Sequence, residues 1–268
     1  MGTIKSDVNI KKWKPSHEDF MYGRTLMALE DYSKVASTNY AQAKVITSPD
    51  KSIHSKYIEG SDILISALVY SALTWRENFN INIEQFNRFL KEDMDTAEKI
   101  LNNYEKVEQI LSGRGFENKR IQSIYSIADN WIHLDLSKRI RQDTQKKLGK
   151  EFREELSTNM YGVGDKISSL FLRMCGYEDI APMDTWAIKY VEARGFVNRR
   201  ADSGLTSEQH AFYENKIRKY AKKYGVSAAL FQATIYAAFS TWKSDSGIDT
   251  LLPLRIGSWP KTTIEEML

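Results

Sequence analysis

The chain has 268 residues, of which 42% are hydrophobic and 12% aromatic, so it can bury a substantial core in one large domain or two small ones. Its single cysteine, Cys175, excludes an intramolecular disulfide and any metal or iron–sulfur site made from cysteines alone, and it fits a reducing compartment. The formal net charge of +3 is too small to select an anionic partner by itself. No stretch reaches the roughly 18 uninterrupted apolar residues that a membrane span needs, and residues 1–15 lack the apolar run of a secretory signal.

Apolar residues recur at helical spacing along most of the chain and almost nowhere alternate as they would in a strand, which predicts an all-α fold. After a polar arm, a first helix is expected to begin between Ser16 and Glu18. The most apolar run, 63–73, follows Ser61 and Asp62 as N-cap candidates and predicts a buried core helix. Further helices are expected within 83–90, 94–101, 107–111 and 121–132, with a turn at 113–116, whereas 35–53 stays open between a helix and a short strand with a turn.

Two segments concentrate positive charge. Seven Lys or Arg residues lie between positions 137 and 153, against two acidic residues, and five more lie on a helix expected around 216–223. The simplest interpretation is a solvated helix face in each case, and the alternative is that both segments flank DNA. Beyond them, Ser227 is expected to cap a strongly apolar helix.

The middle of the chain is cut into short helical pieces. Gly162-Val163-Gly164 separates two helices, with Asp165 as the expected N-cap of the second, which ends near Gly176. A third helix is expected to follow Pro182, with Asp184 as its N-cap.

A turn of this kind exposes successive backbone N–H groups at the positive end of the second helix dipole. Glycines suit it because a Cβ would hold an approaching backbone away. Gly162, Val163 and Gly164 therefore form a candidate site for a nucleic-acid phosphate, although many ordinary helix–helix connections also contain glycine.

Lys166 and Asp184 are the candidate catalytic residues. An amine that is partly desolvated near a helix N-terminus can have a lowered pKa and act as a nucleophile, and a nearby carboxylate can assist it. Taken singly, Lys166 reads as a solvent-exposed lysine and Asp184 as a helix cap. Only their combination with the glycine turn favours an active site.

The run G-V-G-D-K, followed at eighteen residues by M-D-T-W, resembles the helix-hairpin-helix and Gly/Pro…Asp signature of the endonuclease III and 8-oxoguanine DNA glycosylase superfamily. Residues 65–72 resemble the apolar helix of that family, which ends in Ser-Ala, and residues 115–121 resemble its Gly-aromatic-x-x-Lys-Ala stretch. The similarity covers about residues 60–195.

The resemblance implies roles for these residues. Lys166 takes the place of the lysine that, in bifunctional members, attacks the sugar C1′, displaces the damaged base and forms a Schiff base that permits β-elimination. Asp184 takes the place of the essential aspartate, which assists the lysine and stabilises positive charge on the sugar. Leu73, Trp75 and Arg76 lie where relatives carry a wedge that fills the gap left by the flipped base, although core packing explains Leu73 and Trp75 as well.

Some positions depart from the family pattern. Tyr161 stands where the family usually has proline, and Ser168 where it usually has alanine. The four-cysteine cluster of most endonuclease III relatives cannot form, which favours the cluster-free 8-oxoguanine branch, and we expect no metal and no cofactor.

We therefore expect an all-α protein with two helical lobes, a helix-hairpin-helix motif and a lesion-binding cleft between the lobes. Residues 1–74 are expected to form an arm and the first part of a mixed lobe, 75–195 the catalytic lobe, and 196–268 the helices that complete the other lobe.

The expected function is that of a bifunctional DNA glycosylase and AP lyase that excises a damaged base, with an oxidised purine such as 8-oxoguanine as the best candidate. The alternatives are excision of oxidised pyrimidines or another modified base, and a non-catalytic DNA-binding protein. The expected partner is double-stranded DNA with a damaged base, bound by a monomer without membrane contact, in the cytoplasm with the nucleoid or in the nucleus.

Overall fold

The computed structural model describes residues 10–29, 63–74, 85–86, 88–89, 91–112, 117–198 and 204–240. Every secondary-structure element with assigned bounds in these ranges is an α-helix, which confirms the all-α prediction. They are α1 (His17–Leu29), α3 (Ile63–Leu73), α5 (Ala97–Leu101), α6 (Tyr104–Leu111), α7 (Glu117–His133), α8 (Leu136–Gln142), α9 (Gly149–Asn159), α10 (Asp165–Met174), α11 (Thr185–Glu192), α12 (Ser207–Lys223) and α13 (Ala228–Phe239). None of the described helices is both long and apolar enough to cross a membrane.

Local capping explains where several helices begin. At α1, the Asp19 N–H donates to Ser16 Oγ at 3.2 Å, while the Ser16 N–H donates to Asp19 Oδ2 at 2.8 Å. At α13, Ser227 Oγ accepts from the Leu230 N–H, as the sequence predicted. The expected cap at positions 61–62, the ambiguous region 35–53 and the turn at 113–116 lie outside the described residues.

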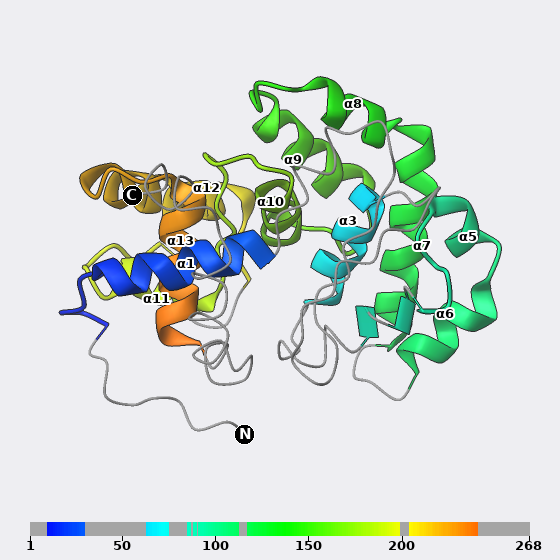
Figure 1. Cartoon of the computed structure of the whole chain (residues 1–268), viewed down its shortest axis with the longest axis horizontal. Helices are drawn as coiled ribbons and strands as arrows, with labels where there is room; N and C mark the ends of the chain where they lie inside the picture. Colours follow the sequence, from blue (N-terminus) through cyan, green and yellow to red (C-terminus); the bar gives the residue numbers. More distant parts are fainter. Residues whose placement is uncertain are drawn as a thin grey trace, which may run out of the picture.

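The hydrophobic core divides into two main clusters, which correspond to the two groups of helices in Figure 1. One cluster draws on α3 and on α5 to α10, and the other on α11, α12 and α13. Helix α1 packs along α13 and adds a small third cluster there. The main clusters divide between Ile180 and Ala181, so α3 packs with the hairpin helices and α11 packs with the C-terminal helices.

Helix α10 packs against α3 and α9 and also touches α12, so it lies at the junction of the two clusters (Figure 1). A buried carboxylate reinforces this junction. Glu214 on α12 is 1% exposed, and its Oε2 pairs with Arg153 of α9 at 2.9 Å and with Arg218 at 3.1 Å. Its Oε1 accepts the Ala181 N–H at 3.0 Å, so α12 holds both α9 and the start of the connection to α11.

We expect Glu214→Gln to lower the free energy of unfolding by about 2 kcal/mol or more, because two largely buried guanidinium groups lose their counter-charge. Urea denaturation monitored by circular dichroism measures the change. The matched control is Glu92→Gln in the pair with Lys106, which is 3.7 Å long and about half exposed on both sides, where the loss should stay below about 1 kcal/mol. Equal losses in the two variants would contradict the importance of this junction.

Candidate active site

The hairpin between α9 and α10 is fixed on α7. Gly162 has a φ of +78°, and a Cβ there would lie 2.9 Å from Ser123 Oγ, so only glycine fits the turn. The Tyr161 N–H donates to Ser126 Oγ at 2.8 Å. Val163 is buried in the first cluster, and its N–H donates to the Met160 carbonyl at 3.1 Å. Two serines of α7 and one buried valine therefore hold the hairpin in place.

Gly164 has a different environment. It is exposed, its φ is −88°, and a Cβ there would meet none of the described atoms within 4 Å, so the fold itself does not demand glycine. Gly164 is the N-cap of α10, so the prediction that Asp165 is the N-cap was wrong. No side chain forms a capping hydrogen bond at this end of the helix. The backbone at Gly164 is already extended, as a cap requires, and Asp165 is the first helical residue, where its charge suits the helix dipole. The terminus of α10 is thus open to an approaching anion.

Lys166 and Asp184 come together across the junction of the two clusters. Lys166 is exposed in the first turn of α10, and Asp184 is the N-cap of α11, where Oδ1 accepts the Ala187 N–H at 2.7 Å. The positive charge of Lys166 acts on the Asp184 carboxylate, although burial has the larger effect on that group. The cap predicted from the sequence is confirmed, and the amine and the carboxylate share one electrostatic environment.

Burial has the largest effect on Asp184 and raises the pKa of its carboxyl above the usual range. The Ala187 N–H, the charges of Lys166 and Arg173, and the Trp186 N–H act in the opposite direction without cancelling it. The ionised carboxylate is therefore kept in a poorly hydrated place, where it interacts strongly with any positive charge that develops nearby.

The second oxygen of Asp184 is bound from α13. Gln232 Nε2 donates to Asp184 Oδ2 at 2.7 Å, and Gln232 Oε1 accepts a hydrogen bond from Arg173 Nη1. The sequence reasoning did not single out Gln232 or Arg173. Each of the two is a polar residue between apolar neighbours on a helix, and this pattern could have revealed them. A polar side chain in such a position is buried only if it has a hydrogen-bond partner.

Helix α12 holds the backbone on both sides of Pro182. His210 Nε2 accepts the Met183 N–H at 3.4 Å, and Glu214 holds the Ala181 N–H as described above. Burial, with the charge of Arg153, lowers the pKa of His210 to about 4, so the ring is neutral at physiological pH and its nitrogen can accept. Neither His210 nor Glu214 stands in a recognisable local pattern, because the backbone groups that they bind are distant in the chain.

Of the three residues proposed as a wedge, the structure describes only Leu73. Leu73 is 1% exposed and packs in the first cluster, which leaves it no surface to offer a duplex. Trp75 and Arg76 lie outside the described residues. The wedge hypothesis therefore rests on those two positions.

Two aromatic residues stack where the start of α11 meets the end of α13. Trp186 lies on Phe239 with ring centroids 5.9 Å apart, and both are partly buried against the second cluster. Lys189 Nζ lies 4.7 Å from the centre of the Trp186 ring.

The basic segment 137–153 is not a uniform cationic face. Arg139 makes a bidentate pair with Glu155 at 2.7 and 2.8 Å, and Arg153 is committed to Glu214. The exposed lysines of this segment, such as Lys150, are better placed to meet an anionic partner.

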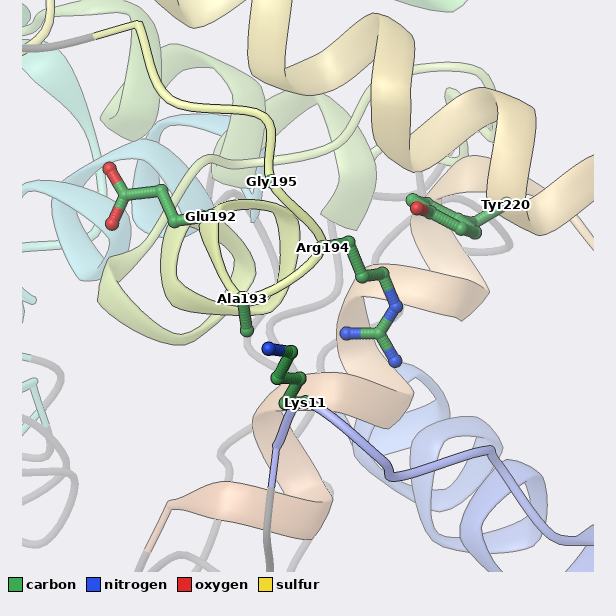
Figure 2. A pocket seen from close by; sticks show the side chains of 6 residues that line it. All are labelled: Lys11, Glu192, Ala193, Arg194, Gly195 and Tyr220. Atoms are coloured by element: carbon green, nitrogen blue, oxygen red, sulfur yellow. The ribbon is translucent and has the colours of Figure 1, made fainter.

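A pocket of about 820 Å³ lies at the opposite end of α11 from Asp184, lined by Lys11, Glu192, Ala193, Arg194, Gly195 and Tyr220 (Figure 2). Figure 2 shows Lys11 and Arg194 on one side of the helix end and Glu192 extending away from them. Arg194 stacks 3.4 Å over Tyr190 and donates to the carbonyls of Ile10 and Trp13 at 3.2 and 2.7 Å. It anchors the N-terminal segment, and about 12 Å of helix separates this pocket from Asp184.

Two solved structures show which fold this chain has. The 8-oxoguanine DNA glycosylase of Thermotoga maritima superposes with a TM-score of 0.58 at 19% identity, over 82% of this chain and 91% of that one. The 8-oxoguanine DNA glycosylase of Methanocaldococcus jannaschii gives a TM-score of 0.53 at 17% identity, over 86% and 96%. The fold is that of the helix-hairpin-helix DNA glycosylases, as the sequence motif indicated.

Comparison of the sequence with protein families identifies the family to which this chain belongs. Residues 51–226 match the family described as 8-oxoguanine DNA glycosylase, and the chain belongs to this family. The 8-oxoguanine DNA glycosylase/AP lyase of Thermotoga sp. (strain RQ2) is 31% identical over 84 residues, which are 31% of this chain and 40% of that protein. The 8-oxoguanine DNA glycosylase/AP lyase of Sulfolobus acidocaldarius is 25% identical over 178 residues, or 65% of this chain and 81% of that protein.

The two hairpin glycines should respond differently to the same change. Gly162→Ala is expected to cost about 1–2 kcal/mol of stability, because a side chain at positive φ is strained and this one also meets Ser123. Gly164→Ala should cost less than about 1 kcal/mol but weaken binding to duplex DNA, because the added methyl group stands at the open helix terminus. Thermal melts and fluorescence anisotropy separate the effects, and an unchanged DNA affinity in Gly164→Ala would rule out a phosphate contact there.

The stability of Asp184→Asn relative to the wild-type protein is expected to increase with pH. Because the folded-state pKa of Asp184 is raised, the ionised form costs stability as the pH rises through that value, whereas Asn carries no charge at any pH. Asn keeps the helix cap but sets its own NH₂ group against that of Gln232, a cost that does not depend on pH. The difference in melting temperature should therefore favour the variant more at pH 7 than at pH 4. Asp129→Asn, which changes an exposed carboxylate, is the control and should shift stability by less than about 0.5 kcal/mol at both pH values. A difference for Asp184→Asn that is the same at pH 4 and pH 7 would contradict the raised pKa.

Proposed function

We propose that the protein is a DNA glycosylase with AP lyase activity that excises an oxidised purine, with 8-oxoguanine as the substrate. The observation that carries the proposal is the placement of the exposed Lys166, in the first turn of a helix whose N-terminus has no side-chain cap bond, within the electrostatic reach of the partly buried Asp184 carboxylate. Membership of the 8-oxoguanine DNA glycosylase family supports an oxidised purine over an oxidised pyrimidine.

In the proposed reaction the unprotonated Nζ of Lys166 attacks C1′ of the damaged nucleotide. The bond from C1′ to the base breaks, and the base leaves with the electron pair and takes up a proton. Positive charge develops on the sugar during this step, and the fixed carboxylate of Asp184 stabilises it. The attached Nζ then loses a proton, the bond from C1′ to the ring oxygen O4′ breaks and O4′ takes up a proton, so that ring opening leaves an iminium between Nζ and C1′. A proton is then removed from C2′, and the 3′ phosphate leaves by β-elimination.

The hairpin performs a separate task in this proposal. The open N-terminus of α10 binds a backbone phosphate of the damaged strand, which sets the distance from the strand to Lys166 in the first turn of the same helix. The damaged base must also leave the stack, at a cost of a few kcal/mol that contacts in the pocket offset. One copy of the chain supplies both the phosphate grip and the reacting pair, so we propose that the monomer acts on double-stranded DNA.

Borohydride trapping tests the proposal. With a duplex that contains 8-oxoguanine, the wild-type protein should release the base, nick the strand and form a reducible covalent adduct. Lys166→Gln should abolish the adduct, while Lys119→Gln, which removes another exposed lysine near a helix N-terminus, should leave it unchanged. An undiminished adduct in Lys166→Gln would overturn the assignment.

A panel of duplexes with other lesions decides the substrate. Faster release of an oxidised pyrimidine than of 8-oxoguanine would contradict the proposed substrate but not the chemistry. Salt-sensitive DNA binding without release of any base would instead identify a non-catalytic DNA-binding protein.

A further inference from the structure

The carboxylate of Asp184 is held at both oxygens by groups from different helices. Oδ1 accepts the N–H of Ala187 within α11, which is the ordinary bond of a helix cap. Oδ2 accepts the Nε2 of Gln232, which comes from α13 and is 48 residues away in the chain. The cap alone would fix only one oxygen, so the direction of the carboxylate depends on Gln232.

The orientation of the Gln232 amide is itself determined. Its oxygen accepts from the Arg173 guanidinium, which offers only donors, so the NH₂ group must face Asp184. The opposite orientation would place an NH₂ against a guanidinium and an oxygen against a carboxylate. Gln232 is 1% exposed and Arg173 is 6% exposed, so water cannot readily compensate for such a flip.

The neutral amide also separates two charges. Arg173 follows Lys166 by seven residues, or two helical turns, which places both cations on one face of α10 about 10 Å apart. A direct pair between Arg173 and Asp184 would draw the carboxylate along α10 and compensate much of its charge. Through Gln232, Arg173 orients the carboxylate while the charge stays available on the side of Lys166.

We propose that Gln232 is a positioning residue, which, held by Arg173, directs the Asp184 carboxylate toward Lys166 and the reacting sugar and keeps it ionised there. The role in catalysis rests on the proposed function, whereas the effect on the carboxylate does not. The charged or titratable groups around Asp184 are Lys166 and Arg173 on α10, and His210 on α12 behind Met183, while α13 contributes the neutral Gln232.

Two variants of Gln232 test this role. Gln232→Glu keeps an acceptor for Arg173 but replaces the donor to Asp184 with a second carboxylate, and Gln232→Met removes both bonds with little change in volume. The control is Gln85→Glu, which changes a comparable buried pair with Arg120 in the other cluster, where the Arg120 Nη1 lies 3.4 Å from the Gln85 oxygen. Circular dichroism melts establish which variants fold.

The first readout is the titration of the Asp184 carboxyl carbon by NMR in the full chain without DNA. Both Gln232 variants should raise the pKa of Asp184, since the carboxylate loses a donor and, in Gln232→Glu, gains a like charge. Gln85→Glu should leave it unchanged. Because the signal belongs to Asp184, titration of His210 does not confuse the result.

The second readout is single-turnover excision as a function of pH. In both variants the rate at neutral pH should fall by roughly 10- to 100-fold and the acid limb should move to higher pH, while the affinity for duplex DNA stays within about twofold. A Gln232 residue that only packs would change neither the Asp184 titration nor the acid limb, and that result in the folded variants would overturn the proposal. If the wild-type protein releases no base, the proposed function fails, and the NMR titration still decides whether Gln232 holds Asp184.

Discussion

The candidate site depends on one constraint: the Asp184 carboxylate is largely removed from water while hydrogen-bond donors and cations lie around it. Burial raises its pKa, and the opposing contributions come from the Ala187 N–H and from the charges of Lys166 and Arg173. The hydrogen bond from Gln232 acts in the same direction as these contributions. A charge held under such conditions acts with little screening on its neighbours.

The Asp184 carboxylate lies at the junction of the two hydrophobic clusters. Asp184 begins α11 four residues after the clusters divide, and the intervening connection is held by Glu214 and His210 of α12. Because the same side chains link α12 to α9 and to this connection, the relative position of the lobes and the position of the carboxylate are set together. A site of this type gives up some stability for function.

Most of the fold could be predicted from the sequence, because helical periodicity and caps are local. The N-caps at Asp184 and Ser227 depend on residues three positions away and were predicted correctly. The cap at α10 was assigned to Asp165 instead of Gly164, since a glycine cap leaves no side-chain signal. Leu73 shows a different difficulty: its position next to the suggested wedge did not reveal that its side chain is in the core.

The candidate site could be predicted only in part. Lys166 and Asp184 stand in a short motif, so a resemblance could name them, and their roles stay a prediction. Gln232 and Glu214 act over 48 and 33 residues or more, and no local pattern specifies the partner of a buried polar group. Their one sequence signal is polarity at a buried helical position, which says that a partner exists but not which one.

The most direct test of the central claim, that Lys166 and Asp184 act on one sugar, is peptide mapping of the borohydride-reduced adduct by mass spectrometry in the wild-type and Asp184→Asn proteins. The sugar remnant should be found on Lys166 in both, and it should form on the order of 100-fold more slowly in Asp184→Asn. A remnant on another lysine, or an equal rate in the two proteins, would contradict it.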